Sequence, residues 1–203
     1  MGTMMEAPHQ NAHHDRIKMN KILTPDNAET SEAAFSVLFL CMGNICRSPT
    51  AHGVFRQMVR AARLDAAIHV SSAGTHNYHP GEPPDHRSQQ TAAARGYDLS
   101  DLRARQMTEA DFVRHDLLLA MDWDNLALAE RVCPPAMRHK LRRLTEFCRQ
   151  HDATVVPDPY YGGEDGFFRV LDLIEDACSG LLDHARARLP HHLSQHDCNG
   201  DHR

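Results

Sequence analysis

The chain has 203 residues, of which 41% are hydrophobic, and it carries a formal net charge of -5. This length and composition fit one globular domain with short extensions, and a second full domain is not expected. A mildly acidic chain also lacks the basic surface that nucleic acids and anionic membranes attract, so its function is expected to come from a local site.

The two ends of the chain differ from its middle. Residues 1–34 are polar and without periodicity, so they are interpreted as a flexible extension, and residues 191–203 are interpreted as a polar, His-rich tail. Their histidines follow no metal-ligand spacing, so no metal site is predicted there. The chain contains no apolar run of 18 residues and no signal-peptide core, so no membrane segment is expected. The folded domain is placed at residues 35–190.

The spacing of the cysteines indicates the redox environment in which the chain works. They stand at positions 41, 46, 133, 148, 178 and 198. This spacing has none of the density of a disulfide framework, so a reducing, cytoplasmic environment is predicted.

The most informative stretch is Ser36–Thr50. Residues 37–40 form a continuous apolar run, which is typical of a strand buried on both faces of a parallel sheet. Ser48 and Pro49 predict the N-cap and the first position of a helix. The residues between them, Cys41–Arg47, would then form a loop whose backbone N–H groups can surround a tetrahedral oxyanion.

The side chains of this loop indicate phosphate-ester chemistry. The guanidinium of Arg47 can bind two phosphate oxygens, and a helix N-terminus beside an arginine favours the thiolate form of Cys41. Ser48 could donate a hydrogen bond to that sulfur, and Asn44 tolerates the positive φ of a tight turn. The alternative for Cys41, a small hydrophobe that ends a core strand, leaves the other residues of the motif unexplained. The phosphate-binding loop is therefore predicted to consist of Met42, Gly43, Asn44, Ile45, Cys46, Arg47 and Ser48.

Helices and strands alternate downstream of this loop, which predicts an α/β fold with the site at the carboxyl ends of the strands. Residues 141–147 are compatible with either a strand or a helical turn, and Asp122 is interpreted as a helix cap that could also brace the site. The other expected elements are a helix at 49–64, a strand at 67–70 with its exit loop at 71–75, a helix at 85–96, a strand at 117–121, a helix from 123 and a last helix at 167–189.

A proline-rich loop at residues 76–84 carries Tyr78 and His79. Taken alone, it is compatible with an ordinary surface turn that contains an amphipathic tyrosine. Asp85 and Arg87 follow it, and they suit an N-cap and a structural ion pair as well as they suit substrate contact.

The second informative loop spans residues 158–163. Pro159 holds Asp158 in an extended conformation, Tyr160 and Tyr161 supply aromatic surface, and two glycines allow a turn into the last helix. An acid beside aromatic rings suits proton delivery to a phenolate leaving group, although Asp-Pro by itself is a common turn opener.

Several strings of this chain resemble the signatures of the low-molecular-weight protein tyrosine phosphatases of bacterial type. They are CMGNICRSP at 41–49, SSAGT at 71–75, Pro-Asp-x-Arg at 84–87 and AMDxxN at 120–125. The resemblance spans residues 36–188. It implies a single α/β domain of the flavodoxin-like, three-layer type, in which helices cover both faces of a four-stranded parallel sheet. It also implies that residues 141–147 contain the fourth strand.

The resemblance further implies hydrolysis of phosphotyrosine in proteins without a metal or other cofactor. Cys41 would attack phosphorus, Arg47 would hold the phosphate, and Asp158 would act first as general acid and then as general base. The substrate wall would consist of Tyr78, His79, Tyr160 and Tyr161. Expected partners are a tyrosine-phosphorylated protein, with a bacterial tyrosine kinase as one candidate, and phosphate or vanadate as inhibitors. The expected state is a monomer or weak dimer.

The residues fit other functions less well. Arsenate reductases of related architecture need a closely spaced cysteine pair downstream, whereas Cys133 and Cys148 are far apart. Protein-arginine phosphatases carry threonine where Ile45 stands. A phosphate-binding module without turnover would not need all three catalytic groups, and Cys46 with His52 lacks a regular zinc spacing. Cys46 is also predicted to capture oxidised Cys41 as a reversible disulfide, the alternative being that it packs beneath the loop.

Overall fold

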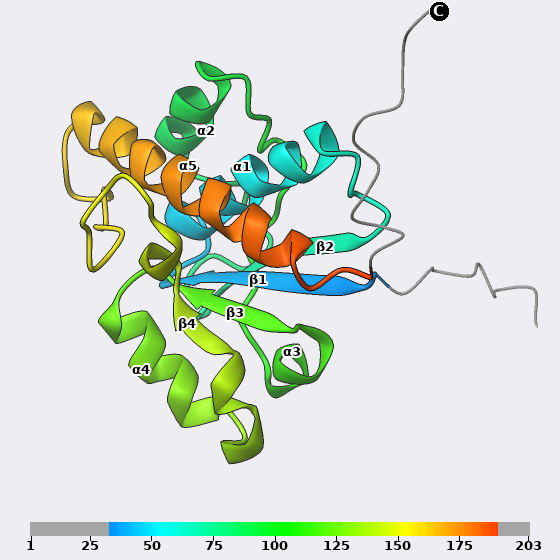
Figure 1. Cartoon of the computed structure of the whole chain (residues 1–203). Coiled ribbons are helices and arrows are strands. Elements are labelled where there is room, and N and C mark those ends of the chain that lie inside the picture. The colour runs from blue at the N-terminus through cyan, green and yellow to red at the C-terminus, as the bar shows by residue number, and fades with distance from the viewer. Residues whose placement is uncertain (1–32, 191–203) are drawn as a thin grey trace, which may run out of the picture. The chain divides into compact units, whose positions relative to one another are not determined.

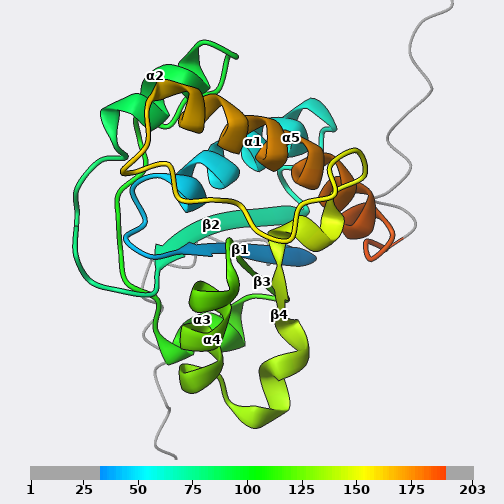
Figure 2. The ribbon, with the colours of Figure 1, turned by 90° about the vertical axis from the view of Figure 1, so that its left-hand side faces the viewer.

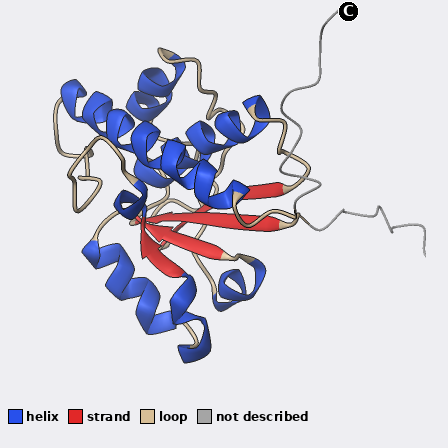
Figure 3. Ribbon diagram, viewed as in Figure 1, coloured by secondary structure: helices blue, strands red, loops and turns tan. Residues whose placement is uncertain are grey.

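The computed structural model describes residues 33–190, and these residues form a three-layer α/β fold (Figure 1). The sheet has four parallel strands in the order β2-β1-β3-β4, and the arrows in Figure 3 all point the same way. The predicted fold class is therefore confirmed. The predictions for the tail and for residues 1–32 of the extension concern residues outside the described range. The strands are β1 (Phe35–Cys41), β2 (Ile68–Gly74), β3 (Leu117–Ala120) and β4 (Leu141–Arg143).

Helices cover both faces of the sheet, as Figure 2 shows from the side. The α-helices are α1 (Arg47–Ala61), α2 (His86–Ala93), α3 (Glu109–Arg114), α4 (Trp123–Val132) and α5 (Glu164–Arg186), with short 3-10 helices η1 (Pro135–Lys140) and η2 (Leu144–Phe147). On one face α1 packs against β1, β2 and α5, and α2 packs against α1 and α5. On the other face α4 packs against β3 and β4. No helix within residues 33–190 is long and apolar enough to cross a membrane.

Strand β1 is the centre of the core and is buried along its whole length. Val37 and Phe39 join the apolar cluster under α1 and α5, whereas Leu38 and Leu40 join the cluster under α3 and α4. This alternation follows from the two-residue period of a strand, and it explains why the sequence is apolar without interruption. Each such side chain contributes about 1.5–3 kcal/mol by leaving water. The loop that follows β1 therefore starts from a rigid support.

Strand β2 is longer than predicted, because residues 71–74, expected as an exit loop, pair in parallel with residues 38–41 of β1. Gly74 ends the strand, and a Cβ at this position would lie 2.7 Å from the carbonyl oxygen of Met42. This close approach brings the end of β2 against the start of the predicted phosphate loop.

One further segment differs from the prediction. Helix α3 was not predicted, because six residues are too short to show helical periodicity; a capping box of Thr108 and Asp111 begins it. Residues 141–147 contain both of the alternatives that were left open, since β4 is followed directly by η2. By contrast, Asp85 caps α2 as predicted, and Gly96 follows that helix with a φ of 83°.

Candidate active site

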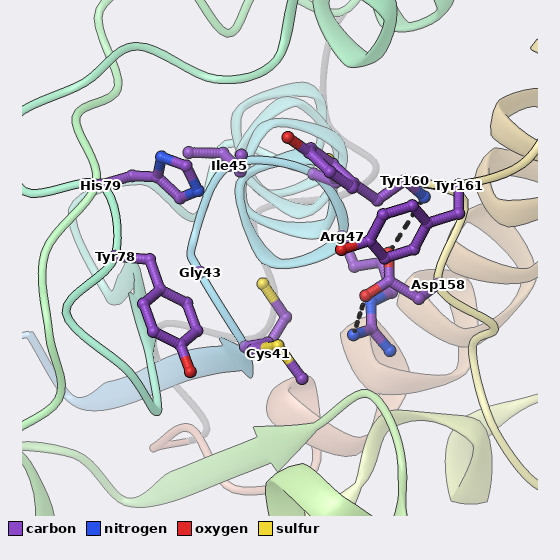
Figure 4. Close-up of a pocket in the computed structure, with 11 residues that line it drawn as sticks. Cys41, Gly43, Ile45, Arg47, Tyr78, His79, Asp158, Tyr160 and Tyr161 are labelled. Atoms are coloured by element: carbon purple, nitrogen blue, oxygen red, sulfur yellow. Dashed lines mark hydrogen bonds and ion pairs between the residues drawn. The ribbon is translucent and has the colours of Figure 1, made fainter.

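A cavity of about 200 Å³ opens at the carboxyl end of β1 (Figure 4). Three loops that are far apart in the sequence meet there: residues 41–47, the proline-rich loop at 76–84, and residues 158–163. The lining residues are Cys41, Met42, Gly43, Ile45, Cys46, Arg47, Tyr78, His79, Asp158, Tyr160 and Tyr161. The structure thus brings together all the predicted site residues except Asn44 and Ser48, whose side chains support the loop from behind.

Cys41 ends β1 with its side chain only 3% exposed, and its sulfur lies 3.0 Å from Ser48 Oγ. Asn44 Nδ2 donates to the same Ser48 oxygen at 2.9 Å. Because Ser48 accepts that bond, its own proton can face an acceptor, and the acceptors within reach are the Cys41 sulfur and, at 3.4 Å, the Ala73 carbonyl oxygen. The predicted contact between Ser48 and the sulfur is present.

The predicted N-cap at Ser48 is wrong. Helix α1 begins at Arg47, its N-cap residue is Cys46, and no side chain caps it. The reason is that the Ser48 hydroxyl is engaged with the sulfur of Cys41 and the amide of Asn44, and not with a backbone N–H of the first turn.

Asn44 holds the loop in its tight conformation. Its φ is 57°, a left-handed conformation that asparagine tolerates better than most residues. Its side-chain oxygen accepts a hydrogen bond from the backbone N–H of Arg105 at 3.0 Å, while its amide nitrogen donates to Ser48 Oγ. Asn44 therefore braces the loop from two sides, as its predicted role in the turn requires.

The backbone of the loop offers a set of free donors. Within the described part of the chain, none of the N–H groups of residues 42–48 donates a hydrogen bond to another residue. They lie between the end of β1 and the first turn of α1, where the helix macrodipole adds positive potential. Such an arrangement binds an oxyanion.

Arg47 is almost fully buried, at 2% exposure, and is held by three acceptors. Its Nη1 donates to Asp122 Oδ2 at 2.5 Å and to the Val156 carbonyl oxygen at 3.1 Å, and its Nη2 donates to Asp158 Oδ2 at 2.8 Å. Burial alone would lower the pKa of Arg47, but nearby Cys41 and the two carboxylates outweigh it and raise that pKa above its ordinary value. Arg47 is therefore a permanent positive charge at the cavity.

Asp122 performs both of the roles that the sequence left open. One carboxylate oxygen accepts the backbone N–H of Asn125 at 2.7 Å and so caps α4, and the other binds Arg47. Asp158 lies at the cavity rim with its side chain 40% exposed, and it also accepts the backbone N–H of Tyr160 at 3.1 Å.

Aromatic side chains lie on two sides of Cys41, with Tyr78 on one side and Tyr160 and Tyr161 on the other (Figure 4). Tyr78 stacks on His76 with ring centroids 4.9 Å apart, and Tyr160 meets Tyr161 edge to face at 5.0 Å. His79 lies against Gly43, and its Nδ1 is 2.8 Å from the carboxylate of Glu82.

The remaining cysteines lie in different surroundings. Cys46 lines the cavity but is only 6% exposed, and burial, with a smaller effect of Asp85, raises its pKa to about 12. Cys133 and Cys148 do not line the cavity. Neither of these two downstream cysteines is therefore placed as the relay that an arsenate reductase needs.

Comparison with known proteins agrees with this geometry. Residues 36–193 match the family model described as low molecular weight phosphotyrosine protein phosphatase. A low molecular weight protein-tyrosine-phosphatase of Streptomyces coelicolor is 42% identical over 154 residues, which cover 73% of this chain and 92% of that protein. The human low molecular weight phosphotyrosine protein phosphatase is 36% identical over 156 residues, which cover 76% of this chain and 98% of that protein.

A solved structure gives the same result. The protein tyrosine phosphatase of Entamoeba histolytica superposes with a TM-score of 0.73 at 39% identity, over 75% of this chain and 97% of that one. The chain belongs to the low molecular weight phosphotyrosine protein phosphatase family.

Proposed function

We propose that this chain hydrolyses phosphotyrosine in proteins through a phosphocysteine intermediate. The observation that carries the proposal is the position of Cys41. Its sulfur lies at the cavity, next to the free N–H groups of residues 42–48 of the described chain and bonded to the Ser48 hydroxyl. A nucleophile at the centre of an oxyanion site has a phosphoryl group as its natural target.

In the first step the thiolate of Cys41 attacks phosphorus and forms the S–P bond. The bond between phosphorus and the tyrosyl oxygen breaks, and Asp158 gives its proton to the departing oxygen. In the second step water attacks phosphorus, Asp158 accepts a proton from it, and the S–P bond breaks to release phosphate and the thiolate. Positioned acid catalysis of this kind contributes about 10²–10⁴-fold.

Arg47 connects phosphate binding to the acid. The Nη2 group that donates to Asp158 is also a donor that a phosphate oxygen can use. A phosphate dianion at this position competes with the carboxylate for Arg47, which frees Asp158 to face the leaving-group oxygen. Substrate binding thereby prepares the acid for the first step, and no metal ion is needed to supply the positive charge.

The walls favour an aromatic substrate. A phosphate on a tyrosine ring can reach the recessed sulfur between Tyr78 and Tyr160, whereas a phosphoserine is too short. Each aromatic contact adds about 0.5–1.5 kcal/mol. Ile45 supplies an apolar surface at the position where protein-arginine phosphatases carry threonine, and this surface offers no hydrogen-bond partner to the guanidinium group of a phosphoarginine.

A metal-free hydrolysis assay tests the proposal. Wild-type protein in the presence of a chelator should release phosphate from p-nitrophenyl phosphate and from a phosphotyrosine peptide, with at least ~100-fold lower kcat/KM on the matched phosphoserine peptide. Comparable efficiency on phosphoserine, or a preference for phosphoarginine, would overturn the substrate assignment. Binding of vanadate without any turnover would instead indicate a phosphate-binding module.

We further propose where the chain acts, on which proteins, and what inhibits it. Residues 35–190 would form the catalytic domain and would act in the cytoplasm on tyrosine-phosphorylated proteins, among which a bacterial tyrosine kinase is a candidate. Phosphate and vanadate would inhibit, since both are oxyanions that fit the loop.

We also propose that the site is sensitive to oxidation. Hydrogen peroxide would oxidise the Cys41 thiolate to a sulfenic acid, and Cys46 would displace water from it to form a disulfide. Both residues line the same cavity. Because the pKa of Cys46 is raised to about 12, capture is expected to be slow at neutral pH and faster in base.

A further inference from the structure

Arg87 connects two of the three loops of the active site. Its guanidinium binds the carboxylate of Asp85 through Nε at 3.0 Å and Nη2 at 2.8 Å. Its remaining group, Nη1, donates to the backbone carbonyl oxygen of Tyr160 at 3.1 Å. One planar side chain thus bonds the start of α2 on one side and the loop that carries Asp158 on the other.

The Asp85 side of this bridge is fixed to the phosphate loop. The backbone N–H of Asp85 donates to the carbonyl oxygen of Ile45 at 2.8 Å, and its carboxylate caps α2 by accepting the backbone N–H of Arg87 at 2.8 Å. The Asp85 side chain is only 10% exposed. Arg87 is therefore positioned relative to the residues that bind phosphate.

The other side of the bridge is held by aromatic contacts as well. The guanidinium carbon of Arg87 lies 4.6 Å from the ring centroid of Phe167, which is buried in the first turns of α5, and 5.4 Å from that of Tyr160. Cation–π contacts at these distances add to the hydrogen bond. They hold Tyr160 between the phosphate loop and the start of α5.

The loop at residues 158–163 has few other attachments. Its hydrogen bonds from Tyr160 N to Asp158 and from Gly162 N to Pro159 are internal. Within the described chain, the side chains from outside that donate to it are those of Arg47 and Arg87. In the proposed mechanism phosphate replaces Asp158 at Arg47, which leaves Arg87 as the side-chain donor that still holds the loop from outside.

We propose that Arg87 is a positioning residue that holds the loop of residues 158–163 over the phosphate loop, so that Asp158 reaches the leaving-group oxygen. This inference rests on the proposed function. Because Arg87 does not line the cavity, it acts through Tyr160 and not on the substrate. Its loss should therefore weaken the proton transfer and leave phosphate binding intact.

The test is the dependence of kcat/KM on the leaving group, since kcat/KM reports the steps up to release of the phenol. Phenyl phosphate, whose leaving group has a pKa of about 10, needs the proton from Asp158, whereas the more acidic nitrophenol needs it less. The variants are Arg87→Ala and Arg87→Lys. Arg95→Ala is the matched control, because Arg95 follows the same helix and binds Asp172 and Glu175 of α5, away from the acid loop.

Arg87→Ala should lose about 10-fold in kcat/KM on phenyl phosphate and less than about 2-fold on p-nitrophenyl phosphate, a fraction of the full acid contribution. Arg87→Lys should behave like Arg87→Ala, because one ammonium group cannot bind Asp85 and the Tyr160 carbonyl in the same fork. Arg95→Ala should keep the wild-type leaving-group dependence. In an Asp158→Asn background, Arg87→Ala should cost nothing further on phenyl phosphate.

Other results would overturn the inference. An equal loss on both esters, no loss, or full rescue by lysine would leave Arg87 with a purely structural role. Circular dichroism melts of each variant would measure that contribution to stability. If Arg87→Ala fails to fold, the same criterion applied to Arg87→Lys decides. A wild-type protein that hydrolyses neither ester would contradict the proposed function itself, which separates the two failures.

Discussion

Arg47 and Asp158 are 111 positions apart in the sequence, yet Arg47 Nη2 lies 2.8 Å from Asp158 Oδ2 at the cavity. The contact joins the group proposed to hold phosphate with the group proposed to donate the proton. It exists because the carboxyl ends of parallel strands, and the loops that follow them, meet at one edge of the sheet.

Asp158→Asn should slow reactions with poor leaving groups most. An amide cannot donate the proton, so kcat/KM on phenyl phosphate should fall by about 10²-fold or more, with a much smaller loss on p-nitrophenyl phosphate. Steady-state kinetics on a series of substituted phenyl phosphates measures this. An equal loss across the series would remove Asp158 from the acid role.

The two roles of Asp122 should be separable by mutation. Asn at this position can still cap α4 with its oxygen, but it then presents an NH₂ group to Arg47, which also only donates. Asp122→Asn should therefore keep the helix cap and lose about 10-fold in kcat/KM, since a clamp of this kind contributes through orientation. Asp122→Ala should lose the same activity and also about 1 kcal/mol of stability. Wild-type activity in Asp122→Asn would mean that Arg47 needs no carboxylate there.

Mild peroxide should link Cys41 to Cys46. Mass spectrometry of tryptic peptides should find the disulfide, dithiothreitol should restore activity, and Cys46→Ser should instead proceed to irreversible sulfinic acid at Cys41. Because the pKa of Cys46 is raised to about 12, the link should form faster at pH 9 than at pH 7. Equal recovery of activity in wild type and Cys46→Ser would indicate that Cys46 only packs beneath the loop.

His52 should make the fold sensitive to acid. Burial, aided by Arg56, lowers the pKa of His52 to about 4, below the value near 6.5 that it has in the unfolded chain. Between these values the unfolded chain binds the extra proton, so stability is unaffected above pH 7 and falls as the pH drops toward 4. The loss between pH 7.5 and pH 5 should be about 2 kcal/mol.

Urea denaturation at the two pH values measures this loss. His52→Gln should reduce it, whereas His86→Gln, whose parent side chain is 77% exposed, should not. An unchanged pH dependence in His52→Gln would show that His52 is not the group responsible.

Much of the architecture could be predicted because it follows from local pattern. The apolar run in β1, the glycine after α2 and the alternation of elements each have one physical reading. Helix α3 and the extension of β2 could not be predicted, because α3 is too short for periodicity and residues 71–74 are strand only through their pairing with β1. Tertiary pairing overrides a polar local sequence there.

The same distinction between local pattern and tertiary contact applies to the residues of the site. The loop from Cys41 to Arg47 was predictable because its residues are contiguous. Asp158 was singled out only by its pairing with the Cys41 loop and by the family resemblance, since Asp-Pro by itself is a common turn opener. The contact between the Ser48 hydroxyl and the sulfur of Cys41 was predicted, but the N-cap at Ser48 was predicted wrongly, because the same hydroxyl does not also cap the helix. The bridge from Arg87 to Tyr160 spans 73 positions, and only the folded chain reveals it.

The central claim is that Cys41 is the nucleophile toward phosphotyrosine, and the most direct measurement is phosphate release from a phosphotyrosine peptide by Cys41→Ser beside the wild type. A serine hydroxyl stays protonated at pH 7, whereas Arg47 and the loop N–H groups remain. The account predicts loss of turnover by at least about 10⁴-fold, with vanadate binding largely retained. Retained turnover in Cys41→Ser would contradict it.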